Sequence, residues 1–251
     1  MPDVHVLPTP GETARAAVEL VERLEAESLT RHGEFSIALS GGSTPRLLYG
    51  LLASPPHRDR LTWPRWLVFW GDERCVPPVH PESNYRMAKE AMLDRVPVDR
   101  ERVNRVLGEA SPESAALYCE RRLHRAFHHC AEPTACPLPP PSFDLILLGL
   151  GEDGHTASLF PGSPALQETR RFAVATQQPP TGAWRVTFTL PLINAARHVA
   201  FVVTGASKAE AARRALSPTP GKPNPPAGLV GLAHGTVDWF VDTSAAGLLK
   251  G

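Results

Sequence analysis

Short apolar runs alternate along this chain with longer segments in which apolar residues recur every three or four positions. The short runs are rich in β-branched and aromatic residues, and they predict strands at 35–39, 65–70, 103–107, 143–148, 172–176, 185–190, 198–204 and 236–241. The periodic segments predict helices at 9–33, 45–54, 82–93, 111–130 and 207–216. Because strands alternate with helices and several strands are almost entirely apolar, we expect an α/β fold whose mostly parallel sheet is covered by helices on both faces.

Two proline-rich stretches, 131–142 and 217–226, lack periodicity and are predicted to be loops. The first of them is also a candidate linker between domains. However, polar loops that follow predicted strands occur on both sides of it, and a site built from both halves requires them to fold together. We therefore expect residues 1–251 to form a single domain.

The composition limits the classes of partner. The chain has 251 residues, of which 42% are hydrophobic, so it can bury a full core. Its 26 basic residues balance 26 acidic ones, which argues against a nucleic-acid surface or a membrane attracted by charge. The first residues lack the basic start and apolar stretch of a secretory signal, so we expect none; no later apolar run is long enough to span a bilayer, and the 4 cysteines do not suggest a disulfide framework. We expect a cytoplasmic protein.

Polar loops with glycine follow four of the predicted strands. They are residues 40–45, 71–74, 150–161 and 205–208. Open α/β sheets bind their ligands at the carboxyl ends of the strands, so these loops are expected to form one cleft. This prediction requires the side chains of His155 and Lys208 to face the same cavity.

Several residues of these loops have the properties of a phosphate site. Gly42 and Ser43 precede a helix, whose unpaired N–H groups and positive dipole end attract phosphate, although the same residues also make an ordinary turn and cap. Lys208 lies in the first turn of another helix, where a cation is disfavoured unless it meets an anion or is solvated. Arg74 and Arg185 lie at strand ends and can each grip a phosphate through two N–H groups, but such arginines are often only solvated.

The catalytic candidates are His155, Asp153 and Asp72. Histidine titrates near neutral pH, so an imidazole in a glycine-lined cleft can take a proton from water. The alternative is a histidine that caps the next helix or bonds a backbone carbonyl, but its place after a buried strand favours catalysis. Asp153 either orients the imidazole or only stabilises the turn, and Asp72 supplies a second carboxylate.

Two other chemistries fit the sequence less well. His124 and His128 lie one helical turn apart near Cys119, His129 and Cys130, a spacing that can bind zinc. The same segment also has the apolar periodicity of an ordinary amphipathic helix, which we favour, and we expect no metal. A serine nucleophile is disfavoured because the chain lacks a G-x-S-x-G motif.

The motifs can also be considered together. They are Ser40-Gly41-Gly42-Ser43-Thr44-Pro45, Trp70-Gly71-Asp72-Glu73-Arg74, His80-Pro81-Glu82-Ser83-Asn84-Tyr85, Gly151-Glu152-Asp153-Gly154-His155-Thr156-Ala157-Ser158-Leu159-Phe160-Pro161, Arg185-Val186-Thr187 and Gly205-Ala206-Ser207-Lys208. In this order they closely resemble the 6-phosphogluconolactonase family over about residues 35–216, and the string around His155 is the most specific of them.

This resemblance implies a Rossmann-like α/β domain of the kind shared with glucosamine-6-phosphate deaminase and ribose-5-phosphate isomerase. It implies hydrolysis of 6-phospho-D-glucono-1,5-lactone to 6-phospho-D-gluconate, the second step of the oxidative pentose phosphate pathway, with no cofactor. We expect His155 to act as the base and N–H groups near 151–154 to bind the oxyanion. The residues expected to hold the phosphate are Gly42, Ser43, Arg74, Arg185 and Lys208. The only partner expected is the lactone, bound by a monomer or weak homo-oligomer.

Two alternatives stay open. The deaminase shares several of these motifs, but it carries a glutamate five residues after the histidine, where this chain has Phe160, and a tyrosine where this chain has Arg74. A sugar-phosphate sensor with the same fold is the other alternative. Such sensors normally carry a DNA-binding helix-turn-helix, and no basic recognition segment occurs beside the first helix.

Overall fold

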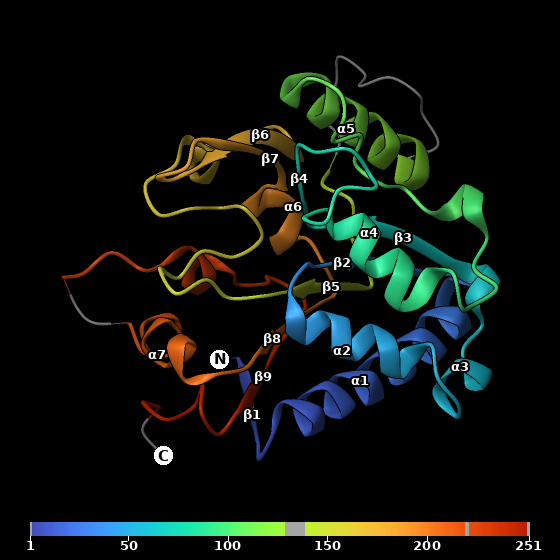
Figure 1. The fold of residues 1–251 in the computed structure, drawn as a ribbon, viewed down its shortest axis with the longest axis horizontal. Coiled ribbons are helices and arrows are strands. Elements are labelled where there is room, and N and C mark those ends of the chain that lie inside the picture. The colour runs from blue at the N-terminus through green and yellow to red at the C-terminus, as the bar shows by residue number, and fades with distance from the viewer. Residues whose placement is uncertain (1, 129–138, 219–220, 250–251) are drawn as a thin grey trace.

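The computed structural model describes residues 2–128, 139–218 and 221–249 (Figure 1). Its larger sheet has six strands in the order β1-β9-β8-β5-β2-β3, and all neighbouring pairs are parallel. The strands are β1 Asp3–Leu7, β2 Phe35–Leu39, β3 Trp66–Trp70, β5 Leu145–Leu148, β8 His198–Val203 and β9 Thr236–Asp242. β2 pairs with both β3 and β5, so strands from either side of the 131–142 stretch are neighbours. The predicted mostly parallel sheet is confirmed.

Side chains of the central strands alternate between two core clusters, one on each face of the sheet. Ile37 and Val68 belong to one cluster, whereas the next residues along, Ala38 and Phe69, belong to the other. Helices α1 (Pro10–His32) and α2 (Ser43–Leu52) cover the first face, and α5 (Pro112–His128) and α7 (Ala209–Leu216) cover the second (Figure 1). Burial on both faces explains why these strands are apolar runs.

The remaining helical segments are short. They are α3 His57–Arg60, α4 Asn84–Ala88, α6 Leu190–Asn194, a π-helical turn η2 Lys89–Leu93, and the 3₁₀ turns η1 Trp63–Arg65, η3 Arg100–Arg102, η4 Pro164–Gln167, η5 Ala206–Lys208 and η6 Pro226–Leu229. The predicted helix at 82–93 is thus divided into α4 and η2. None of the helices among residues 2–128, 139–218 and 221–249 is long and apolar enough to cross a membrane.

A second, antiparallel sheet of three strands was not predicted. Its order is β4-β7-β6, with β4 Asp72–Arg74, β6 Ala173–Gln178 and β7 Ala183–Phe188. We predicted strands close to β6 and β7 but expected residues 71–74 to form only a loop. The backbone N–H of Phe188 donates to the carbonyl of Gly71 at 2.8 Å, and this contact brings the chain after β3 alongside β7.

Two further predictions of strands need correction. No strand forms at 103–107, where only Val103 makes an isolated bridge, to Val68. Conversely, β1 was missed because it lies at the edge of the sheet and is mostly exposed, so its sequence lacks an apolar run.

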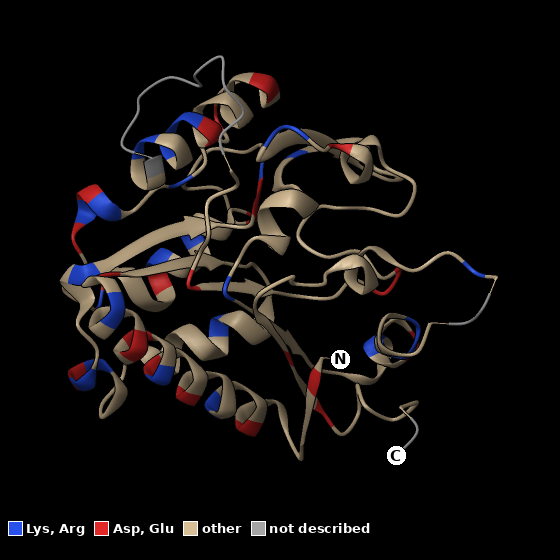
Figure 2. Ribbon diagram, turned by 180° about the vertical axis from the view of Figure 1, so that it is seen from behind, with Lys and Arg blue, Asp and Glu red and all other residues tan. Residues whose placement is uncertain are grey.

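Acidic and basic residues are interspersed along the helices, most visibly on α1 (Figure 2).

Candidate active site

The loops after β2, β3, β5 and β8 meet at one edge of the large sheet, because these strands are parallel neighbours. They border a cavity of about 270 Å³, which we call the site cavity. Its lining residues are Ser40, Gly41, Gly42, Asp72, Arg74, Asn84, Gly149, Leu150, Gly151, His155, Ala157, Arg185 and Lys208. His155 and Lys208 therefore line the same cavity, which is the arrangement that the prediction of one cleft required.

His155 is held in place by its neighbour Asp153. The Asp153 Oδ1 atom lies 2.6 Å from Nδ1 of the imidazole and accepts the backbone N–H of His155 at 3.0 Å. Burial raises the pKa of Asp153, but the hydrogen bonds and charge of His155 outweigh it, so this pKa lies below its ordinary value. An ionised Asp153 fixes Nδ1 as the protonated nitrogen, which leaves Nε2 as the acceptor. Nε2 has no hydrogen bond to any described residue.

Gly151 provides the space for this imidazole. A methyl group at Gly151 would lie 2.0 Å from Nδ1 of His155 and 2.7 Å from Oδ1 of Asp153. Both distances are far below van der Waals contact, so any larger residue must displace the histidine or the aspartate. The sequence predicted a glycine-lined cleft around His155, and at Gly151 the glycine is required by the close approach of the side chains.

Replacing Gly151 with alanine is therefore expected to lower kcat at least tenfold, because a shift of about 1 Å in a catalytic group has large effects. Steady-state kinetics on the substrate proposed below measures this change. Gly231→Ala is a matched control, since a methyl group added at Gly231 would have no atom within 4 Å. Equal kcat for Gly151→Ala and the wild-type protein would show that the imidazole needs no such space.

The same turn contradicts part of our expectation for the oxyanion, which concerned the N–H groups near 151–154. The N–H of Gly151 donates to the carbonyl of His155 at 2.8 Å, and the N–H of Gly154 donates to the carbonyl of Gly151 at 3.0 Å. These two groups already stabilise the turn. They are not available to a negatively charged oxygen, so the prediction was wrong for both of them.

Asp72 lines the site cavity and connects β4 with the loop that carries His155 and with α4. Its Oδ2 atom accepts a hydrogen bond from the hydroxyl of Ser158 at 2.6 Å, and its Oδ1 atom lies 3.3 Å from the amide Nδ2 of Asn84. Ser158 belongs to the loop after β5 that carries His155, which we call the histidine loop, and Asn84 is the first residue of α4. Asp72 therefore positions the histidine loop against β4, and no hydrogen bond joins it to His155 among the described residues.

The neighbouring Glu73 has a different role. Its carboxylate accepts hydrogen bonds from the backbone N–H groups of Arg74, Asn84 and Tyr85 and from the hydroxyl of Ser83. Burial raises its pKa, and these bonds oppose that shift. Glu73 thus caps α4 and does not line the site cavity.

Arg74 and Arg185 face each other directly across the β4–β7 ladder. The Nε atom of each is buried and has no hydrogen-bond partner. Burial, followed by the positive charge of Arg74, lowers the pKa of Arg185. Like charges directly opposite in a sheet destabilise it, which makes this pair a candidate site for an anion.

Lys208 is positioned by a turn that the sequence did not fully reveal. The N–H of Gly205 donates to both oxygens of Asp242, at 3.0 and 3.1 Å, and the hydroxyls of Thr204 and Thr44 lie 2.7 Å apart. The bonds to Asp242 join the end of β8 to the end of β9, and the contact between the two threonines joins it to the start of α2. Asp242 is the last residue of β9 and has no motif around it, so only its position at the same sheet edge could have suggested this role.

The glycine loop after β2 reaches the site cavity through Ser40, Gly41 and Gly42. The hydroxyl oxygen of Ser40 is buried without a hydrogen-bond partner, which marks it as a further candidate for ligand contact. Gly42 has a φ of 110°, a conformation that favours glycine.

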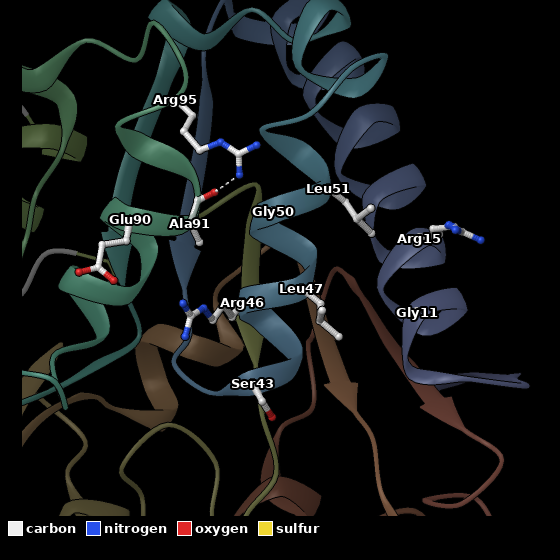
Figure 3. A pocket seen from close by; sticks show the side chains of 10 residues that line it. All are labelled: Gly11, Arg15, Ser43, Arg46, Leu47, Gly50, Leu51, Glu90, Ala91 and Arg95. Carbon is white, nitrogen blue, oxygen red and sulfur yellow. Dashed lines mark hydrogen bonds between the residues drawn. The ribbon is translucent and has the colours of Figure 1, made fainter.

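Ser43 is not among the residues that line the site cavity. Its side chain lines a larger cavity of about 740 Å³ on the outer face of α2, together with Arg46, Leu47 and Arg95 (Figure 3). The helix begins at Ser43, earlier than the expected start at Pro45, and this start places the serine on the outer face. The predicted phosphate contact of Ser43 therefore receives no support from the lining of the site cavity.

The alternative zinc site lies partly outside the described residues, because nothing is described of His129, Cys130 or the His128 side chain. His124 is buried, with its ring 5.3 Å from that of Phe172. Among the described residues, no group of three histidine, cysteine or acidic side chains is arranged to hold a metal.

The family model and the curated relatives that match this chain point to the same family. Residues 8–239 match the family model described as glucosamine-6-phosphate isomerases/6-phosphogluconolactonase. The chain is 38% identical over 249 residues to a 6-phosphogluconolactonase of Nostoc sp., covering 98% of each chain. It is 38% identical to the probable 6-phosphogluconolactonase 1 of Arabidopsis thaliana, covering 92% of this chain and 88% of the relative.

Solved structures agree. The structure of 6-phosphogluconolactonase from Trypanosoma cruzi superposes with a TM-score of 0.87 at 32% identity, covering 100% of this chain and 98% of that one. A monomeric glucosamine-6-phosphate deaminase has a TM-score of 0.77 at 20% identity, over 98% of this chain and 99% of that one, which shows a shared fold.

Proposed function

Because the chain belongs to the family of glucosamine-6-phosphate isomerases and 6-phosphogluconolactonases, we propose that it hydrolyses 6-phospho-D-glucono-1,5-lactone to 6-phospho-D-gluconate. The observation that carries this proposal is the site cavity, which brings His155 together with Arg74, Arg185 and Lys208. The imidazole of His155 can take a proton from water, and the three basic side chains can hold the 6-phosphate. In this proposal the reaction is the second step of the oxidative pentose phosphate pathway, takes place in the cytoplasm and consumes only water.

The surroundings of His155 support ester hydrolysis over the deaminase reaction. Phe160 is buried, and its ring centre lies 4.8 Å from that of the imidazole. This phenylalanine replaces the glutamate of the deaminase motif, so a carboxylate for its proton relay is missing at that position. Arg74 replaces the deaminase tyrosine and adds a positive charge beside Arg185.

The proposed mechanism begins with the phosphate bound by Arg74, Arg185 and Lys208, which places the lactone carbonyl carbon C1 near His155. Nε2 of His155 takes a proton from a water molecule as the water oxygen attacks C1. Asp153 stabilises the imidazolium that forms. The bond between C1 and the ring oxygen then breaks, and the imidazolium returns the proton to that oxygen. The product is the open-chain acid, which ionises to 6-phosphogluconate.

A coupled assay of lactone hydrolysis, corrected for the spontaneous reaction, tests the proposal. Turnover well above the spontaneous rate is expected, with saturation by the phosphorylated lactone and weak activity on the lactone without phosphate. Release of ammonia from glucosamine 6-phosphate would instead support the deaminase. Tight binding of sugar phosphates without turnover of either substrate would support a sensor.

Lys208→Ala is expected to raise KM for the lactone by about 10–100-fold with little change in kcat, because it removes a charge-assisted bond worth about 1.5–3 kcal/mol. Steady-state kinetics over a range of lactone concentrations separates the two parameters. Lys222→Ala is a suitable control, since Lys222 is exposed and does not line the site cavity. A loss confined to kcat would contradict the assignment of Lys208 to the phosphate.

A further inference from the structure

Arg74 and Arg185 border a second cavity besides the site cavity. This outer cavity has a volume of about 650 Å³, and it shares only these two residues with the lining of the site cavity. The arginine pair therefore lies between a smaller cavity that contains His155 and a larger one that lacks it. An anion held by the pair can belong to a ligand that occupies either cavity.

The guanidinium groups extend to the outer cavity. A terminal nitrogen of Arg74, Nη1, donates to the carbonyl of Glu82, and a terminal nitrogen of Arg185, Nη2, donates to the side-chain oxygen of Gln178. Both acceptors line the outer cavity, and neither lines the site cavity. The other terminal nitrogens, Nη2 of Arg74 and Nη1 of Arg185, have no partner among the described residues, so they remain available to an anion.

A partly exposed tryptophan, Trp184, belongs to the lining of the outer cavity. Trp184 is 40% exposed, whereas the four other tryptophans of the chain are 2% exposed or less. Pro112 and Ala183 add apolar surface beside it, and Gln178 and Thr181 add polar groups. An accessible indole within the same cavity as two arginines is the combination that recognises a planar base attached to phosphate.

The volumes of the two cavities also favour a ligand larger than the sugar phosphate in the outer cavity. The outer cavity, at about 650 Å³, lies within the range of small-molecule sites and exceeds the 270 Å³ of the site cavity. The space beyond the arginine pair is larger than the phosphate of the sugar substrate requires. It can contain a nucleoside as well as a phosphate.

We propose that the outer cavity binds a nucleotide, whose phosphates contact Arg74 and Arg185 and whose base packs on Trp184. This inference rests on the proposed function, because the same arginines would hold the 6-phosphate of the lactone. The two ligands then compete for one pair of cations, so the nucleotide inhibits lactone hydrolysis competitively. Trp184 contacts only the nucleotide.

Isothermal titration calorimetry with ATP tests the binding directly, without divalent cations. We expect one site per chain, at least tenfold tighter binding of ATP than of tripolyphosphate, which lacks the base, and weaker binding of ATP when 6-phosphogluconate is present. Equal affinity for ATP and tripolyphosphate would show that the arginines bind an anion without a base site. Absence of ATP binding, or binding that 6-phosphogluconate does not weaken, would also overturn the proposal.

Trp184→Ala provides the matched test. It is expected to weaken ATP binding and ATP inhibition about tenfold, because base stacking contributes this much or more, while kcat and KM for the lactone stay unchanged without nucleotide. Leu229→Ala, which removes another apolar side chain that is 40% exposed, should change neither ATP binding nor ATP inhibition. Unchanged ATP affinity in Trp184→Ala would overturn the proposal. If the chain fails to hydrolyse the lactone, calorimetry still measures nucleotide binding, so the two failures are distinguishable.

Discussion

Replacing His155 with alanine is expected to lower kcat for lactone hydrolysis by about 10²–10⁴-fold, the usual contribution of a general acid–base group. The variant loses Nε2 of His155, which has no hydrogen bond to any described residue. This atom is the proposed acceptor for the proton of water. Affinity for 6-phosphogluconate should stay near the wild-type value, because Arg74, Arg185 and Lys208 are untouched. The measurements are steady-state turnover, with spontaneous hydrolysis subtracted, and calorimetric binding of the product.

His234→Ala is the matched control for this experiment, since His234 is exposed and lies away from the site cavity. It should retain wild-type kcat and KM. If His155→Ala keeps full turnover while binding the product normally, the imidazole has no part in the chemistry. If product binding is lost together with turnover, the histidine acts on the substrate phosphate, and the proposed division of the site is wrong.

The convergence of the loops on one cleft could be predicted because it depends on a general property of parallel sheets. Each loop follows an apolar run that had to be a buried strand, and the carboxyl ends of parallel strands lie at one edge. His155 after β5 and Lys208 after β8 illustrate this. No side-chain detail was needed, only the order of strands and loops.

The pairing of Arg74 with Arg185 could not be predicted in the same way. It depends on β4, a strand of three residues that forms only because β7 lies beside it. Nothing local in Asp72-Glu73-Arg74 favours a strand over a turn, and antiparallel register between distant segments has no signature in either sequence. The family resemblance named both arginines, but not their contact.

Two residues of small size show why local patterns have limits. Gly151 and Ser43 both lie in turns, where glycine and serine are common for several physical reasons. At Gly151 the reason is the imidazole packed against its α-carbon, and at Ser43 it is the first turn of α2. Which reason applies depends on how the side chains of the same turn fold back on the backbone, or on the residue at which a helix begins.

Arg185→Gln is expected to raise KM for the lactone by about 10–100-fold, because a charge-assisted bond to phosphate is worth about 1.5–3 kcal/mol. Unusually for a half-buried residue, the same change should leave the melting temperature of the ligand-free protein unchanged or raise it. Burial and Arg74 lower the pKa of Arg185, which means that its charged form is less stable in the folded protein than in the unfolded chain. At neutral pH the charge therefore costs folding free energy, and this cost would disappear only as the pH rises toward the pKa of the guanidinium.

Steady-state kinetics and thermal denaturation with and without 6-phosphogluconate check both parts. The ligand should raise the melting temperature of the wild-type protein strongly and that of Arg185→Gln weakly, since binding energy appears as stability. Arg23→Gln removes an exposed arginine that pairs with Glu27 on α1, and it should alter neither KM nor the effect of the ligand. A fall of several degrees in Arg185→Gln with unchanged KM would mean that the arginine pair stabilises the small sheet and holds no phosphate. Weaker binding of the substrate together with an unchanged or higher stability of the ligand-free protein is the specific result expected when two like charges are kept together for an anion.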